Sequence, residues 1–254
     1  MSRKRNQRRN AELVDLGNAL VQNGLAVQEG PKRKTWNPLD IRVIKPLKPT
    51  QEEMFHAWQN LQHMCVHGSA GTGKTFLACY LALQEVLAKS QQRIIIVRSA
   101  VPTREVGYLP GTLEEKMQQY EEPYRDIMWE LIGKSSTYQD MKEAGLIEFH
   151  STSFLRGLTW DNAIVIIEEA ENLTFHEIDS VMTRLGDNTR VIITGDTKQT
   201  DLDGSKRMGA EGLSQAISVF DKMGSFSTIK FNVHDIVRSE TVKSWIMACE
   251  DLAA

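Results

Sequence analysis

The residues best suited to chemistry lie in one short run with the pattern Gly-x-x-x-x-Gly-Lys-Thr, which marks a phosphate-binding loop. The run consists of Gly68, Ser69, Ala70, Gly71, Thr72, Gly73, Lys74 and Thr75. Its glycines can adopt positive φ angles, so that backbone N–H groups converge on an anion at the start of a helix. Lys74 is expected to reach the β- and γ-phosphates of a nucleotide, and the Thr75 hydroxyl to bind Mg²⁺. The alternative is a glycine-rich turn without a ligand, but apolar runs on both sides predict the strand, loop and helix that the motif requires.

Two adjacent carboxylates, Glu168 and Glu169, follow an apolar run at 163–167 that predicts a buried strand. Ligands bind at the carboxyl ends of strands in open α/β sheets. We therefore expect Glu168 to hold Mg²⁺ through water and Glu169 to orient and polarise the attacking water. The alternative is an acidic turn in solvent, which four preceding apolar residues make the weaker interpretation.

A third polar segment follows the apolar run at 191–194, where Gly195 opens a loop that continues to Gln199. A neutral amide can bond a phosphate oxygen and a water at the same time. Gln199 is thus a candidate sensor of the γ-phosphate, and the alternative is an ordinary polar loop residue.

These residues require a scaffold of alternating strands and helices. Apolar runs predict strands at 64–67, 93–98, 147–149, 163–167, 191–194 and 227–231. Helices are predicted from residue 50, from residue 75, and at 112–132, 174–185, 209–222 and 239–252. The alternation predicts an α/β fold with a mainly parallel sheet and helices on both faces.

The amino-terminal part differs from the rest of the chain in charge. Residues 1–48 hold 11 Lys and Arg against 4 Asp and Glu, whereas residues 49–254 hold 19 against 29. We expect residues 1–44 to form a basic arm and linker, partly disordered or docking, and residues 45–254 to form one domain. A basic arm is compatible with nucleic-acid binding, while the acidic body argues against a basic surface all round.

Composition restricts the remaining classes. No apolar run approaches the roughly 18 to 20 residues of a membrane span, so the expectation is a soluble, cytoplasmic protein without a membrane partner. The three cysteines lie far apart and predict buried packing in a reducing compartment. His63 and His67 fall in a predicted strand, which favours packing or polar roles over a zinc site.

Several motifs together resemble the PhoH-like family, a single-core branch of the RecA-like P-loop ATPases related to superfamily-one helicases. The matching segments are the phosphate loop, 97–101 with 107–111, 168–172, 182–186, 194–202 and 235–238. The resemblance spans residues 45–254 and implies ATP binding by the loop, Mg²⁺ and water handling by Glu168 and Glu169, and a sensor role for Gln199. It also implies that Gln51 contacts adenine, with a common helix-start glutamine as the alternative. The family usually has Asp where Glu168 stands, and the longer side chain is expected to slow hydrolysis.

A single core of this type has consequences for assembly. Related helicases bind ATP between two such domains, so an arginine that stabilises the γ-phosphate is expected to come from another subunit. Arg238 is the first candidate and Arg184 the second, each with a salt-bridged structural role as the alternative. The resemblance suggests a homo-oligomeric ring, a hexamer. Arg98, Arg104 and Tyr108 are candidate contacts to single-stranded RNA or DNA, with ordinary packing as the alternative.

The sequence thus predicts an oligomeric, Mg²⁺-dependent ATPase that acts on RNA or single-stranded DNA in the manner of a helicase or translocase. A slow or non-hydrolysing ATP-binding ring that acts as a switch or scaffold is the rival. A small-molecule kinase is a third interpretation, against which the loop after Gly195 and the lack of a recognisable acceptor lid both count.

Overall fold

The computed structural model of the chain describes residues 36–99, 113–155, 157–196 and 208–253. Four predictions fall outside these residues: the amino-terminal arm up to residue 35, Arg104, Tyr108 and Gln199. Within the described part, Ile41 is buried in the core and the Arg42 N–H donates to the Leu131 carbonyl at 2.8 Å. The division of the chain near residue 45 stays a prediction.

The centre of the fold is a six-stranded sheet in the order β3-β2-β4-β5-β1-β6. Its strands are β1 (His63–Gly68), β2 (Arg93–Arg98), β3 (Ile147–Ser151), β4 (Ala163–Glu168), β5 (Arg190–Gly195) and β6 (Phe226–Phe231). All neighbouring strands pair in parallel. The structure thus confirms the predicted α/β class with a parallel sheet, and β5 lies between β1, which precedes the phosphate loop, and β4, which carries Glu168.

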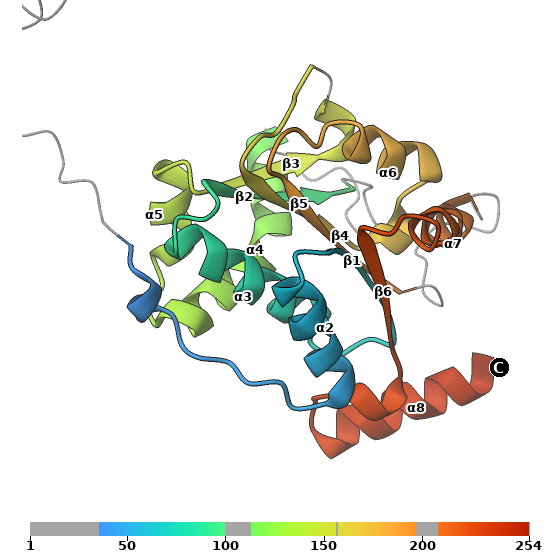
Figure 1. The fold of residues 1–254 in the computed structure, drawn as a ribbon. Helices are drawn as coiled ribbons and strands as arrows, with labels where there is room; N and C mark the ends of the chain where they lie inside the picture. Colours follow the sequence, from blue (N-terminus) through green and yellow to red (C-terminus); the bar gives the residue numbers. More distant parts are fainter. Residues whose placement is uncertain (1–35, 100–112, 156, 197–207, 254) are drawn as a thin grey trace, which may run out of the picture. The chain divides into compact units, whose positions relative to one another are not determined.

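Helices cover both faces of the sheet, as expected (Figure 1). One face carries α2 (Pro49–Gln59), α3 (Lys74–Leu87), α4 (Leu113–Ile132) and α5 (Thr137–Glu143), and the other carries α6 (Phe175–Met182) and α7 (Met208–Phe220). The helix α8 (Glu240–Ala253) ends the described chain. The described residues also form the 3-10 turns η1 (Pro38–Asp40), η2 (Thr152–Phe154), η3 (Ala170–Asn172) and η5 (Val233–Asp235). The helix α5 was not predicted, because its seven residues are too few for a clear periodicity.

Alternation along the strands explains their continuous apolar runs. Ile94 and Ile96 of β2 pack with the helices α2 to α5, whereas Ile95 and Val97 pack on the side of α6 and α7. The same alternation holds in β4 and β5. Because helices cover both faces, the middle positions of the central strands are buried on both sides, which favours apolar residues there.

The parallel arrangement brings the candidate site residues together at the carboxyl-terminal ends of the strands. The phosphate loop follows β1, Arg98 ends β2, Glu168 ends β4, and Thr194 and Gly195 end β5. In the register between β2 and β4, Arg98 is the partner of Glu168. Residues far apart in the sequence therefore meet at the carboxyl edge of the sheet.

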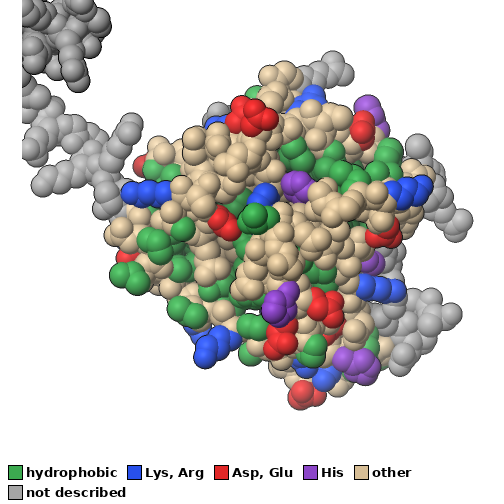
Figure 2. All heavy atoms as spheres, viewed as in Figure 1, with side chains coloured by type: hydrophobic (Ala, Val, Ile, Leu, Met, Phe, Trp, Pro, Cys, Tyr) green, Lys and Arg blue, Asp and Glu red, His purple; other side chains and the backbone are tan. Residues whose placement is uncertain are grey.

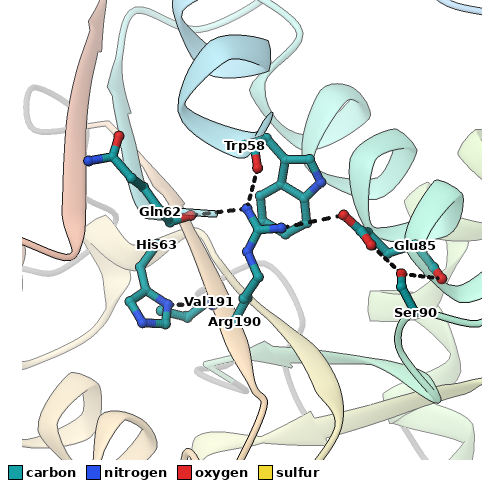
Figure 3. Close-up of polar contacts among 7 residues, drawn as sticks. All are labelled: Trp58, Gln62, His63, Glu85, Ser90, Arg190 and Val191. Carbon is teal, nitrogen blue, oxygen red and sulfur yellow. Dashed lines mark hydrogen bonds and ion pairs between the residues drawn. The ribbon is translucent and has the colours of Figure 1, made fainter. Parts of the chain in front are cut away.

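At the other end of the strands, Arg190 at the start of β5 connects several elements (Figure 3). Its guanidinium lies 3.2 Å from the ring centroid of Trp58, and Nη2 donates to the carbonyls of Trp58 and Gln62 at 2.8 and 3.2 Å. Nη1 pairs with Glu85 Oε1 of α3 at 3.4 Å. Burial lowers the pKa of Arg190 to about 10, so the side chain remains charged at neutral pH. This arginine links α2, α3 and β5, and α3 is the helix that begins at the phosphate loop.

Near Arg190, His63 has a structural role. Its Nδ1 accepts a hydrogen bond from the Val191 N–H at 3.2 Å, and its ring packs against Phe226. Within the described ranges no group of three His, Cys, Asp or Glu side chains is placed to hold a metal ion.

The surface shows charge of both signs. On the face drawn in Figure 2, Lys and Arg side chains are dispersed among acidic and uncharged ones. Among the described helices none is long and apolar enough to cross a membrane. The prediction of buried cysteines is confirmed for Cys65 and Cys79 but wrong for Cys249, which is exposed on α8. Much of α8 faces solvent, including Trp245 at 72% exposure, so a cysteine in this helix need not be buried.

Candidate nucleotide-binding site

The phosphate loop connects β1 directly to α3. Gly68, Gly71 and Gly73 have φ angles of 113°, 71° and 87°, a region that glycine adopts without strain. Among the described residues, no side chain caps the first turn of α3. The N–H groups of that turn and the positive end of the helix dipole are therefore oriented toward the space where the motif predicts a phosphate.

Lys74 is held by its own loop. Its Nζ donates to the carbonyl oxygens of Gly68 at 2.6 Å and Ser69 at 2.8 Å. A phosphate bound in the loop would compete with these two carbonyls for the ammonium, and it would be the stronger partner because it is charged.

Thr75 and Glu168 are brought together from motifs 93 residues apart, and the Thr75 hydroxyl donates to Glu168 Oε2 at 3.1 Å. The Thr194 hydroxyl donates to the other carboxylate oxygen of Glu168. Glu168 is thus fixed by α3 on one side and β5 on the other. The sequence analysis did not include Thr194 in the site, although it is a polar residue directly after three buried apolar residues of a strand.

The environment of Glu168 shifts its protonation. Burial raises the pKa of the Glu168 carboxyl to about 7, although hydrogen bonds from Thr194 and Thr75 oppose the shift. A carboxylate that is desolvated in this way gains from a nearby cation, because the cation compensates the buried charge.

Glu169 lies directly after β4 with φ 50° and ψ 48°, the left-handed region. Its carboxylate forms an ion pair with Arg98 at the end of β2, and the guanidinium of Arg98 lies over the ring of Tyr120 at 5.3 Å from the centroid. Burial disfavours the charged form of Arg98, but the Glu169 carboxylate and Tyr124 outweigh that effect, so the pKa of Arg98 is raised. From the sequence, Arg98 is a candidate contact to nucleic acid with ordinary packing as the alternative, and in the structure it lies beside the candidate base Glu169.

Glu171 supports the end of β5. Its Oε2 accepts a hydrogen bond from the Asp196 N–H at 3.0 Å, and burial raises the pKa of the Glu171 carboxyl to about 7. A side chain at Gly195 would collide with this contact, since an added Cβ would lie 3.0 Å from Glu171 Oε2 and 2.8 Å from Leu213 Cδ2. Glu171 therefore positions the segment that leads toward Gln199.

Several of these groups line one pocket of about 700 Å³. Its wall includes the phosphate loop from Gly71 to Thr75, Glu168, Glu169, Arg98, the α4 residues Pro123 and Tyr124, and the segment from Ile44 to Leu47. A cavity of this size is in the range of small-ligand sites. The pocket lies at the carboxyl edge of the sheet, where the sequence analysis expected it.

Gln51 lies in this wall with both ends of its amide engaged. Its Oε1 accepts from the Leu47 N–H at 2.7 Å, and its Nε2 donates to the Thr72 carbonyl at 3.1 Å. In the structure Gln51 connects the segment before α2 to the phosphate loop. Its contact with adenine stays a prediction.

The two candidate arginines differ in position. Arg238 lines the pocket of its own chain, where the neighbouring Val237 N–H donates to the Gly71 carbonyl at 3.0 Å. Arg184 instead donates to the carbonyls of Leu155 and Ser180 and is not part of the pocket wall. The structure thus favours a structural role for Arg184, and it shows that Arg238 lies near the loop within one chain.

Comparison with known proteins agrees with this geometry. The profile of the PhoH-like protein family matches residues 43–250. The chain belongs to the PhoH-like family. A PhoH-like protein from Synechocystis is 38% identical over 184 residues, which cover 72% of this chain and 55% of that protein. Protein PhoH from Escherichia coli K12 is 33% identical over 205 residues, which cover 79% of this chain and 57% of that protein.

This PhoH-like chain spans little more than half the length of those relatives. Among solved structures, the Pif1 helicase from Candida albicans is similar with a TM-score of 0.43 and 15% identity, over 83% of this chain and 44% of the helicase. The family membership covers the whole pocket, since residues 43–250 include every residue that lines it.

Proposed function

We propose that this PhoH-like chain binds ATP together with Mg²⁺ and hydrolyses it. The observation that carries the proposal is the hydrogen bond between Thr75 and Glu168. It joins the phosphate loop to the acidic strand end in one pocket, and these are the two parts that a P-loop NTPase needs at the same phosphate group.

The side chains at this point fit Mg²⁺. The Thr75 hydroxyl and the Glu168 carboxylate are hard oxygen donors of the kind that Mg²⁺ prefers, and a Mg²⁺ site needs only one or two protein groups in addition to phosphate and water. When bound, the ion would neutralise charge on the β- and γ-phosphates. The desolvated carboxyl of Glu168, whose pKa burial raises, would be stabilised as a carboxylate by that cation.

Each remaining group of the site then has a separate role in binding or hydrolysis. The loop from Gly68 to Thr75 binds the phosphates through backbone N–H groups, and Lys74 neutralises the β- and γ-phosphates. Glu169 orients the attacking water and accepts its proton. Gln199 senses the γ-phosphate, and Gln51 contacts the adenine of ATP. Arg238 stabilises charge that develops on the transferred phosphoryl group.

The wider proposal is an oligomeric ATPase, a homohexamer, that acts on single-stranded RNA or DNA. It is supported by the single nucleotide-binding core in the described residues, because related two-core enzymes complete their site with a second domain. A second copy of the chain would supply that surface here. Arg238 lines the pocket of its own chain, and its action across a subunit interface is part of the proposal.

A specific observation favours the rival function, a slow ATP-binding switch or scaffold. Glu169 is ion-paired with Arg98, so its carboxylate is occupied by the guanidinium rather than available to hold a water molecule. If nothing released this pair, ATP would be bound and only slowly hydrolysed, and its role would be to organise a ring.

Steady-state ATP hydrolysis with and without single-stranded RNA separates the two. For the motor we expect stimulation of about tenfold, the size of an ordinary coupling between two sites. Single-stranded DNA of the same length and double-stranded RNA serve as controls for the kind of polymer. Turnover that is slow and unchanged by any polymer would contradict the motor and support the scaffold.

The mass of the assembly tests the ring directly. Measured in solution with and without a non-hydrolysable ATP analogue, it should correspond to a hexamer in at least one condition. A monomer in both conditions would contradict the oligomer and with it any arginine delivered by a neighbouring subunit.

A further inference from the structure

Arg98 lies inside the pocket rather than on the outer surface. It ends β2 at the carboxyl edge of the sheet, its side chain is only 17% exposed, and it lines the same cavity as Lys74 and Glu168. An arginine so enclosed is poorly placed to track the backbone of a polymer, which needs accessible cations. Its position instead suits a contact with the ligand that the pocket binds.

The contacts of Arg98 leave part of its donor capacity unused. The guanidinium pairs with Glu169 and stacks on Tyr120. Its Nε and the Tyr124 hydroxyl are both buried without a hydrogen-bond partner among the described residues. Buried donors are normally satisfied, and an arginine can present two parallel N–H groups to a carboxylate or a phosphate. A phosphate group is therefore a natural competitor of Glu169 for this side chain.

The partner in this ion pair is the candidate base. The Glu169 carboxylate is 38% exposed and stands on a residue in the left-handed region, so it is more accessible than Arg98 and its backbone is less relaxed. The pair can thus exchange without unpacking the core, because the Glu169 carboxylate is partly exposed while the guanidinium of Arg98 keeps its contact with the ring of Tyr120.

We propose that Arg98 is a γ-phosphate contact supplied by the same chain, and that a bound triphosphate takes Arg98 from Glu169 and thereby frees the carboxylate to act on water. This inference rests on the proposed ATPase function and adds to it a nucleotide-binding role for Arg98, which the sequence analysis treated only as a candidate contact to nucleic acid. A nucleoside diphosphate has no γ-phosphate, so it would leave the Arg98–Glu169 pair in place. Triphosphate binding and activation of Glu169 become one event.

The test compares Arg98→Gln and Arg98→Lys with the parent chain in equilibrium binding of ADP and of an ATP analogue with a non-hydrolysable β–γ bridge. We expect Arg98→Gln to weaken analogue binding by about ten- to hundredfold, the range for a lost hydrogen bond to a charged group, while ADP binding changes less than about twofold. Arg98→Lys keeps the charge but not the paired N–H geometry, so its affinity for the ATP analogue should lie between those of the parent chain and Arg98→Gln.

Arg93→Gln is the matched control. Arg93 begins the same strand and pairs with Glu148 at 2.9 Å, but it lies at the opposite end of β2 from the pocket. Its replacement removes an equivalent ion pair and should leave both nucleotides unaffected. Thermal unfolding of all variants, followed in parallel, reports any loss of folded protein.

Three results would overturn the inference. One is faster hydrolysis by Arg98→Gln with unchanged analogue affinity, which would mean that Arg98 only restrains Glu169. A second is equal weakening of ADP and the analogue, which would indicate a packing role. A third is unchanged binding and turnover. By contrast, a parent chain that binds neither nucleotide would refute the proposed function itself, and the two failures are thus distinguishable.

Discussion

Glu169→Gln is expected to slow ATP hydrolysis by about two to four orders of magnitude while ATP still binds. Glutamine has nearly the same shape as glutamate, so it can hold a water molecule, but it cannot accept the proton. The variant also lacks the negative charge that holds Arg98 in the structure. Triphosphate affinity should therefore be equal to that of the parent chain or higher, and the effect should appear in turnover alone.

Single-turnover hydrolysis combined with equilibrium ATP binding measures the two effects separately. Glu148→Gln is the matched control, because Glu148 pairs with Arg93 away from the pocket and its loss should leave hydrolysis unchanged. If Glu169→Gln hydrolysed ATP at the parent rate, another group would have to position the water, and the assignment of Glu169 as the base would be wrong.

Gly68→Ala is expected to cost more than about 4 kcal/mol of folding free energy, which places it in the severe class of single substitutions. Gly68 is the register partner of Phe231 in the parallel pair of β1 and β6. An added Cβ would lie 2.0 Å from the Phe231 carbonyl oxygen, and the φ of 113° is itself unfavourable for any residue with a side chain. The clash cannot be relieved without separating β6 from the start of the phosphate loop, and the unfavourable φ would persist even then.

Urea unfolding of Gly68→Ala and Gly145→Ala measures this cost against a suitable reference. Gly145 also has a positive φ, of 73°, but nothing lies within 4 Å of an added Cβ. Its replacement should cost only about 1 to 2 kcal/mol, the price of the left-handed conformation alone. Similar stability of the two variants would show that the close approach of Gly68 to Phe231 is not rigid.

The fold was largely predictable because its signals are local. The central strands β2, β4 and β5 contain short apolar runs, since both faces of the sheet are covered at these positions. The phosphate loop was predictable for a different reason. Its function depends on backbone geometry that only a few residue types permit, so the pattern itself is informative.

The pairing of side chains was not predictable, because it depends on which strands are neighbours. The ion pair between Arg98 and Glu169 follows from β2 lying beside β4, and the contact of Thr194 with Glu168 follows from β5 lying on the other side of β4. The sequence contains these residues but not the strand order. In the same way, the reasoning from a single core placed Arg238 at a neighbouring subunit, whereas in three dimensions it also lines the pocket of its own chain.

The most direct test is equilibrium binding of ATP, in the presence of Mg²⁺, to the parent chain and to Lys74→Ala. The Nζ of Lys74 lies against the carbonyls of Gly68 and Ser69 within the loop, where it would face the phosphates. We expect the parent chain to bind ATP and the variant to bind about a hundredfold more weakly, in line with the loss of charged contacts to phosphate. Equal affinity of the two proteins for ATP would contradict the assignment of this pocket as the nucleotide site.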